Sequence, residues 1–403
     1  MPVFLPFRAY RPQKDKVAKF SAKTADFSSQ EEVIEEMHAH PESYFHVTKQ
    51  HLLDNGKKSV EHYFEKGAAF FKSQVENNNL FRDKVPCFYV YRQIDPVTNK
   101  IFTGIIGLAD VHDLELNTIK KHELTKVVRE EYLYKQMHYT GVLGEPVLLG
   151  YPHSEEIQAL IEATMVKEPE YQFVTIDKKE HTVWLINTSV DLEKLTELCA
   201  ELPAFYIADG HHRCASTIRN YERFPVPINR YFMVYLLDEN QFNIGSFHRL
   251  LSDFDFNEKC RQGLEEYFNV EDYTPGELFI PTRHSEFGLL TREYSLKLML
   301  KHEPRTHNPE AHLDVSILEN KLFKPILDIH HPRTDHRLSY MSASEDIQNV
   351  KRLIADKEVD VVISNFPVTF SEVKQVADAN KSMPPKSTYI EPKLRGGMII
   401  QKF

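Results

Sequence analysis

The stretch that decides the fold is Phe205-Tyr-Ile-Ala-Asp-Gly-His-His-Arg-Cys-Ala-Ser-Thr217. Its first four residues are apolar or aromatic, as an interior strand requires, Asp-Gly is a tight-turn pair, and the residues that follow suit a helix. A strand that enters a helix through a glycine turn places free backbone N–H groups and the positive end of the helix dipole at the end of the strand. The stretch therefore predicts an α/β fold with polar side chains gathered at a sheet edge.

The same alternation of strands and helices continues on both sides of this stretch. From Cys87 to Leu108 the pattern is strand, turn, strand, and further interior strands are predicted at 146–151, 182–186, 204–208 and 231–237. Helices are predicted at 120–138, 154–166, 191–201, 211–221 and 371–379, and residues 28–76 carry amphipathic helical spacing after a serine cap. The fold class is α/β or α+β with a mixed sheet.

The length of 403 residues indicates two to three domains at about 150 residues each. We expect a mostly helical N-terminal region over 1–100, a mixed-sheet core over 101–250 and a C-terminal α/β region over 251–403 that closes the active site. Near the end of the chain, Pro384-Pro385 predicts an extended loop.

The charge balance narrows the function classes. Lys and Arg total 49 against 59 Asp and Glu, a net charge of −10, which opposes broad binding to nucleic acid or to an anionic membrane. An anionic substrate would need a local cationic pocket. The four cysteines are scattered and indicate free thiols, and no leader peptide or apolar span of about 18 residues occurs. We expect a cytoplasmic protein.

The polar residues after the predicted strand at 204–208 are the first candidate site. The helix N-terminus suits a phosphate, Gly210 lets the backbone approach an anion closely, and Arg213 adds a guanidinium that can bind two oxygens at once. The alternative is that Asp209 only caps the helix while His211 and His212 sit at the surface.

A second candidate is His122-Glu123, which follows an apolar extended segment and offers a general base or a metal ligand. The alternative is a solvated helix start. The zinc-protease pattern H-E-x-x-H is not met, because Lys126 stands where the second histidine belongs.

A third candidate is the loop that contains Lys386, Ser387 and Thr388, whose ammonium and hydroxyl groups suit phosphate or carboxylate oxygens; the alternative is a surface connection. Arg249 in Ser246-Phe-His-Arg offers a further anion contact or a structural arginine. Neither of the two common glycine-rich nucleotide motifs occurs.

Three of these segments together carry a family resemblance. Ala208-Asp-Gly-His-His-Arg-Cys-Ala215 resembles the signature of the ParB/sulfiredoxin-like phosphotransferases, in particular the free L-serine kinases, which also have an upstream His-Glu pair and a C-terminal Ser-Pro-Lys-Thr-Thr loop. Four other stretches resemble the family catalogued as domain of unknown function 1015: Pro6-Phe-Arg-Ala-Tyr-Arg-Pro12, Lys121-His-Glu-Leu-Thr125, Phe247-His-Arg-Leu250 and Leu313-Asp-Val-Ser-Ile-Leu318.

The resemblance implies a phosphotransferase core over 101–250 and transfer of a phosphoryl group between a small carrier and the hydroxyl of free L-serine, giving O-phospho-L-serine. It makes Glu123 the group that orients or deprotonates the hydroxyl, with Asp209 and His211 beside it. Gly210, His212 and Arg213 complete the phosphate loop. His122 and Lys386-Ser-Thr388 would bind the substrate, and Mg²⁺ on the phosphates would have Asp209 as its carboxylate ligand.

The carrier and the direction stay open. Pyrophosphate is preferred because the chain is of the long type and lacks familiar nucleotide loops, with ADP or ATP as the other donors, and the reaction can also run in reverse in serine biosynthesis. Lys23-Thr-Ala-Asp-Phe-Ser28 and Tyr389-Ile390 depart from the family pattern. The competing class is a non-catalytic ParB-like nucleotide-binding or regulatory protein. Small-molecule substrates, with no nucleic acid and no membrane, are the expected partners.

Overall fold

The computed structural model describes residues 1–23 and 29–403, so most of the departing segment Lys23–Ser28 lies outside the described residues. The chain divides into two compact units, one formed by residues 1–242 with 392–403 and the other by residues 243–391. The last twelve residues therefore return to the first unit.

The first unit is built on a mixed nine-stranded sheet with the order β6-β11-β8-β12-β5-β4-β10-β9, and β1 (Phe4–Leu5) pairs with β5. The hairpin predicted from Cys87 is confirmed as β4 (Phe88–Asp95) and β5 (Lys100–Asp110). The other predicted interior strands are confirmed as well. They are β8 (Val147–Tyr151), β10 (Glu180–Ile186), β11 (Phe205–Asp209) and β12 (Tyr231–Asp238). At one end, β9 (Tyr171–Val174) pairs with β10.

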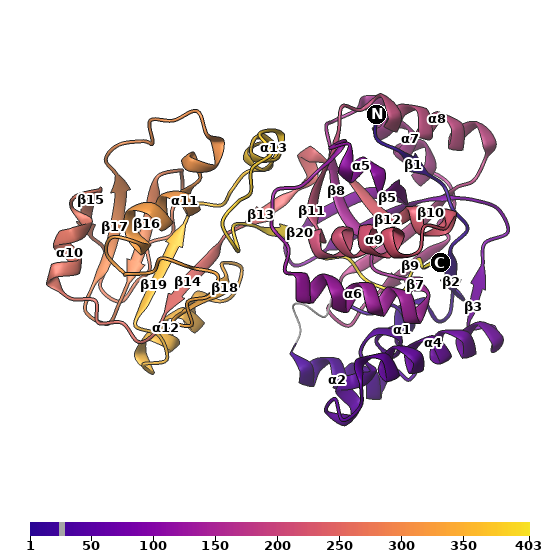
Figure 1. The fold of residues 1–403 in the computed structure, drawn as a ribbon, viewed down its shortest axis with the longest axis horizontal. Helices are drawn as coiled ribbons and strands as arrows, with labels where there is room; N and C mark the ends of the chain where they lie inside the picture. The colour runs from indigo at the N-terminus through magenta and orange to yellow at the C-terminus, as the bar shows by residue number, and fades with distance from the viewer. Residues whose placement is uncertain (24–28) are drawn as a thin grey trace. The chain divides into compact units, whose positions relative to one another are not determined.

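Helices cover this sheet. Side chains of α7 (Glu155–Met165) and α8 (Ser189–Glu201), among them Ile161 and Leu195, are fully buried against the strands. On α9 (His211–Arg223), Cys214 joins the same core. Figure 1 shows α6 (Val127–Thr140) running beside α9. Arg219 of α9 binds Glu130 and Glu131 of α6 at 2.7 and 3.3 Å, which ties the two helices together.

The predicted helices over 28–76 are also confirmed. They are α2 (Gln30–Ala39), α3 (Phe45–Thr48), the 3₁₀ helix Gln50–Asp54 and α4 (Val60–Glu76). Ser29 and Glu32 form a reciprocal capping box at the start of α2. Figure 1 shows α2 and α4 close to each other in this unit, and the buried side chains of Val33, Met37 and Phe71 form a core of their own. The same N-terminal region holds α1 (Val17–Phe20) and two strands that pair with each other, β2 (Tyr10–Pro12) and β3 (Leu80–Arg82).

One predicted helix is wrong over its first part. Residues 120–138 were expected to be helical, but Lys120 ends the strand β6 (Ile119–Lys120) and the helix α6 begins only at Val127. Ile119 and Lys120 pair with Phe205 and Tyr206 of β11, so a non-local ladder overrides the local helical pattern.

The second unit contains a six-stranded antiparallel sheet with the order β15-β17-β16-β19-β14-β18. Its strands are β14 (Phe247–Leu251), β15 (Phe268–Asp272), β16 (Glu286–Leu290), β17 (Ser295–Leu300), β18 (Leu338–Ser342) and β19 (Val361–Asn365). The helices are α10 (Glu258–Leu264), α11 (Asp314–Leu318), α12 (Ile347–Ala355) and α13 (Phe370–Asp378). A short ribbon of β13 (Asn243–Gly245) and β20 (Tyr389–Glu391) joins its two chain ends.

The expected mixed α/β class is therefore confirmed. No helix in the described part of the chain combines the length and the apolar character that a bilayer crossing requires.

Candidate active site

The candidate site of the first unit lies where β6 and β11 end. These strands are parallel, with Phe205 opposite Ile119, so both leave the sheet at the same edge. His122 and Glu123 follow β6 directly, and Gly210 to Arg213 follow β11. Two segments almost ninety residues apart in sequence are thus placed side by side by one short parallel pairing.

Gly210 makes the turn between β11 and α9. Its φ of +100° and ψ of 26° lie in a left-handed region that favours glycine, and it stands at the N-cap position with no side-chain hydrogen bond to the first turn of the helix. Gly210 itself offers no side chain to the first backbone N–H groups of this 13-residue helix, and a glycine turn at a helix N-terminus is an arrangement that binds phosphate.

Asp209, the last residue of β11, contacts two cations. Its carboxylate lies 3.1 Å from Arg213 Nη2 and 3.4 Å from Lys393 Nζ, and its side chain is 36% exposed. Two cations therefore neutralise a carboxylate beside the helix N-terminus, where its negative charge would otherwise repel a phosphate.

Arg213 is held from three sides. Its guanidinium contacts Asp209, donates to the carbonyl oxygen of Pro146 at 2.7 Å and lies 3.7 Å from Glu145. Pro146 precedes β8, which is antiparallel to β11, so the start of β8 lies beside the end of β11. These contacts fix a cation whose side chain is only 15% exposed at the first turn of α9.

The two histidines nearest Glu123 are buried and neutral. Burial lowers the pKa of His122 to about 4, although a hydrogen bond with the Ile207 backbone opposes the shift. Burial, and then the neighbouring His122, His212 and Lys121, hold the pKa of His211 well below its usual range. Neither ring is charged at neutral pH, so neither supplies a cation for a phosphate.

The contacts of His211 define which ring nitrogen carries its proton. The backbone N–H of His122 donates to His211 Nε2 at 3.4 Å, so Nε2 is the acceptor and Nδ1 bears the hydrogen. His211 Nδ1 lies 3.7 Å from a carboxylate oxygen of Glu123, whose side chain is 44% exposed. His211 therefore directs its N–H toward a carboxylate that solvent or substrate can reach.

His122 has one ring nitrogen that makes no hydrogen bond to the described residues. Its ring packs edge-on against that of His211, with centroids 4.5 Å apart, and its Nδ1 is buried without a hydrogen-bond partner among the described residues. His212 is half-buried in the first turn of α9.

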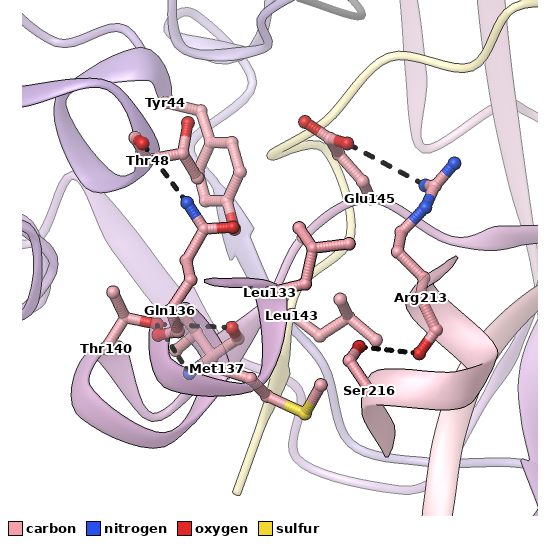
Figure 2. Close-up of a pocket in the computed structure, with 12 residues that line it drawn as sticks. Tyr44, Thr48, Leu133, Gln136, Met137, Thr140, Leu143, Glu145, Arg213 and Ser216 are labelled. Atoms are coloured by element: carbon pink, nitrogen blue, oxygen red, sulfur yellow. Dashed lines mark hydrogen bonds and ion pairs between the residues drawn. The ribbon is translucent and has the colours of Figure 1, made fainter. Parts of the chain in front are cut away.

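A cavity opens beside Arg213, between α6, α9 and the residues before β8. About 420 Å³ of space, part of it open to solvent, lies between apolar walls of Leu133, Met137 and Leu143. Figure 2 shows Glu145 and Arg213 pointing toward each other at this cavity, with the Ser216 hydroxyl donating to the Arg213 carbonyl oxygen at 2.7 Å.

The third candidate segment lies in the second unit. Lys386 is exposed, Ser387 is buried and Thr388 is half-buried. The expectation of an extended loop is wrong at Lys386, whose φ is +54°, and the Ser387 hydroxyl donates to the Pro384 carbonyl oxygen at 2.7 Å. A proline restricts its own φ and the residue before it, so the two prolines leave Lys386 free to turn.

Sequence reasoning missed Lys393 and Glu145. Both reach Asp209 or Arg213 from segments far from them in sequence, and no local pattern marks them.

The comparison with known families rests on most of the chain. Residues 4–316 match the family described as Protein of unknown function (DUF1015). The chain belongs to this family. No curated protein matches this DUF1015 chain.

Several solved structures share part of the DUF1015 fold. A free serine kinase in complex with AMP is 12% identical, with 72% of this chain and 90% of that chain covered and a TM-score of 0.36. SbnI with C-terminal truncation from Staphylococcus aureus is 12% identical, with 73% and 85% covered and a TM-score of 0.39. A conserved hypothetical protein from Pyrococcus furiosus is 13% identical, with 73% and 94% covered and a TM-score of 0.36. At these values the likenesses carry no argument about what this DUF1015 chain binds.

Proposed function

We propose that the protein is a phosphotransferase that moves a phosphoryl group between a small phosphate carrier, preferably pyrophosphate, and the hydroxyl of free L-serine. The observation that carries the proposal is the position of an accessible carboxylate, Glu123, beside the glycine turn at the N-terminus of α9, with Arg213 on the first turn of that helix. Phosphoryl transfer to an alcohol needs a base that accepts the hydroxyl proton and positive charge beside the phosphate oxygens.

In the proposed reaction the phosphate of the carrier lies against the N–H groups after Gly210 and against the Arg213 guanidinium. Glu123 accepts the proton of the serine hydroxyl while the serine oxygen forms the new O–P bond, and the bridging P–O bond of pyrophosphate breaks to release phosphate. His211 Nδ1 lies 3.7 Å from the Glu123 carboxylate, and burial keeps the His122 and His211 rings neutral, so neither ring places a positive charge beside the proposed base.

Mg²⁺ stays part of the proposal. Among the described residues no three histidine, cysteine, aspartate or glutamate side chains gather as a metal site. Mg²⁺ that is bound mainly through substrate phosphates needs only one or two carboxylates, and Asp209, 36% exposed, is the one we propose. When bound, the ion would neutralise the charge that develops on the phosphate oxygens.

Lys386, Ser387 and Thr388 are proposed to bind the carboxylate or phosphate of the substrate. The support is the chemistry of their donors and the exposure of the ammonium, together with the motif that the family resemblance assigns to them.

A donor screen tests the proposal. The full chain is incubated with L-serine, Mg²⁺ and either pyrophosphate, ADP or ATP, and O-phosphoserine is quantified. We expect phosphoserine with one donor, and the reverse reaction from O-phosphoserine and the product of that donor, which is phosphate for pyrophosphate, AMP for ADP and ADP for ATP. Silence in both directions with every donor, in a protein that still binds a nucleotide, would instead support a nucleotide-binding regulatory protein.

A further inference from the structure

The second unit buries an arginine that has no acidic partner. Arg249, in the middle of β14, is 2% exposed, and no carboxylate among the described residues lies within 4.0 Å of its guanidinium. Burial lowers the pKa of Arg249 to about 10, so it stays charged at neutral pH. A buried charge is costly unless it is paired, so this cation needs an account of its own.

Its partners are three neutral oxygens. Nη1 donates to the Phe247 carbonyl oxygen at 2.6 Å and to the Asn365 side-chain oxygen at the end of β19, and Nη2 donates to the Lys386 carbonyl oxygen at 3.3 Å. The neighbouring His248 is neutral, since burial lowers its pKa to about 4, so it changes the charge around Arg249 in neither direction. The guanidinium therefore links the ends of β14 and β19 to the loop of Lys386 without an ion pair, and the carboxylates of Asp314 and Glu319 act on its charge only from beyond 4.0 Å.

The loop on the other side of this contact is also cationic. The Lys386 ammonium lies over the Phe247 ring, 5.2 Å from the centroid, and no carboxylate among the described residues lies within 4.0 Å of it. The same residue holds its left-handed φ of +54° with its carbonyl oxygen on Arg249. Two cationic side chains thus contact Phe247, one at its carbonyl oxygen and one at its ring, and neither forms an ion pair among the described residues.

We propose that Arg249, seated on Asn365, is a positioning residue that holds the Lys386 turn and whose unpaired charge favours an oxyanion, a phosphate or a carboxylate, on that loop. The ion-binding role of the loop rests on the proposed function; the positioning role does not. The amide of Asn365 gives the guanidinium an acceptor without neutralising its charge, whereas a carboxylate at position 365 would pair that charge.

Two substitutions separate the positioning role of Arg249 from the role of its charge. Arg249→Lys removes the planar fork and should loosen the turn, while Asn365→Asp keeps an acceptor on Nη1 and pairs the charge. Arg337→Lys is the control, because that guanidinium is already paired with Asp335 at 2.7 Å in the same unit. Hydrogen–deuterium exchange of the peptide around 384–389 measures how firmly the Lys386 turn is held. Titration calorimetry with inorganic pyrophosphate and, separately, with L-serine measures the affinity for each ligand.

We expect faster exchange in Arg249→Lys but not in Asn365→Asp, and about tenfold weaker binding of one of the two ligands in both variants. The ligand that weakens identifies the oxyanion as phosphate or carboxylate. Asn365→Asp also loses the hydrogen bond that Asn365 Nδ2 donates to the Phe366 carbonyl oxygen at 2.6 Å, so wild-type exchange of the 384–389 peptide is the sign that the loop keeps its fold in this variant. Unchanged exchange in Arg249→Lys refutes the positioning role whatever the enzyme does, and unchanged binding of both ligands in Asn365→Asp refutes the role of the charge. If the donor screen is silent while these shifts occur, the proposed reaction fails and the inference stands.

Discussion

Replacing Gly210 by alanine tests whether the turn at the end of β11 positions the phosphate-binding groups. At a φ of +100° an L-residue is strained by about 1–2 kcal/mol. For a unit of this size that corresponds to a fall in melting temperature of roughly 2–8 °C. The added Cβ would also lie 3.2 Å from Arg213 Nε and 3.3 Å from its Nη2, closer than an ordinary contact.

The guanidinium must therefore shift by a few tenths of an ångström from the position that its contacts hold. A charge-assisted hydrogen bond contributes about 1.5–3 kcal/mol, so losing one to the phosphate should lower kcat/KM by roughly 10- to 150-fold. Phosphoserine formation measures this loss and calorimetry measures the melting temperature. The matched control is Gly141→Ala, where φ is +68° but no atom lies within 4 Å of the new Cβ.

Gly141→Ala should lose stability and keep its activity. The reasoning is refuted if Gly210→Ala melts at the wild-type temperature. It is also refuted if Gly210→Ala is destabilised like the control and still forms phosphoserine at the wild-type rate.

Three further predictions concern pH and metal. The unfolded chain protonates His122 at its ordinary pKa and the folded protein only near 4, so the stability that His122 contributes is complete above pH 6.5 and falls between pH 6.5 and 4. Urea unfolding should show that His122→Gln loses less free energy of unfolding over this range than the wild type, and an equal loss would contradict the burial of this ring. Burial raises the pKa of Asp314 to about 6, so the contribution of Asp314 to stability falls as pH rises through 6. The free energy of unfolding of Asp314→Asn should therefore exceed that of the wild type by up to about 2–3 kcal/mol at pH 8 but by little at pH 4, and the same gain at both pH values would contradict this reasoning. EDTA should abolish phosphoryl transfer without changing the melting temperature, since the described residues form no metal cluster; a large drop in melting temperature would indicate a structural metal instead.

Local patterns were sufficient wherever one element follows the next in sequence. The hairpin of β4 and β5 was predictable from alternating apolar residues around a proline turn, and β11, Gly210 and α9 were predictable from the turn pair alone. Within the candidate site this was enough to select Gly210 and Arg213.

Pairings between distant segments were not predictable in the same way. β6 has only two residues and exists because β11 lies beside it, so its sequence carries no strand signal. The ion pair of Lys393 with Asp209 depends on the return of residues 392–403 to the first unit, and the turn at Lys386 depends on the buried Arg249. Each of these features is set by tertiary contacts that no window of sequence contains.

The rate of phosphoserine formation in Glu123→Gln tests the central claim most directly. Glu115→Gln, an exposed glutamate of the first unit, is the control. With the best donor at saturation, the loss of a general base should lower kcat by at least about 100-fold in Glu123→Gln, with donor binding unchanged and with Glu115→Gln at the wild-type rate. A Glu123→Gln protein that forms phosphoserine as fast as the wild type would contradict the account.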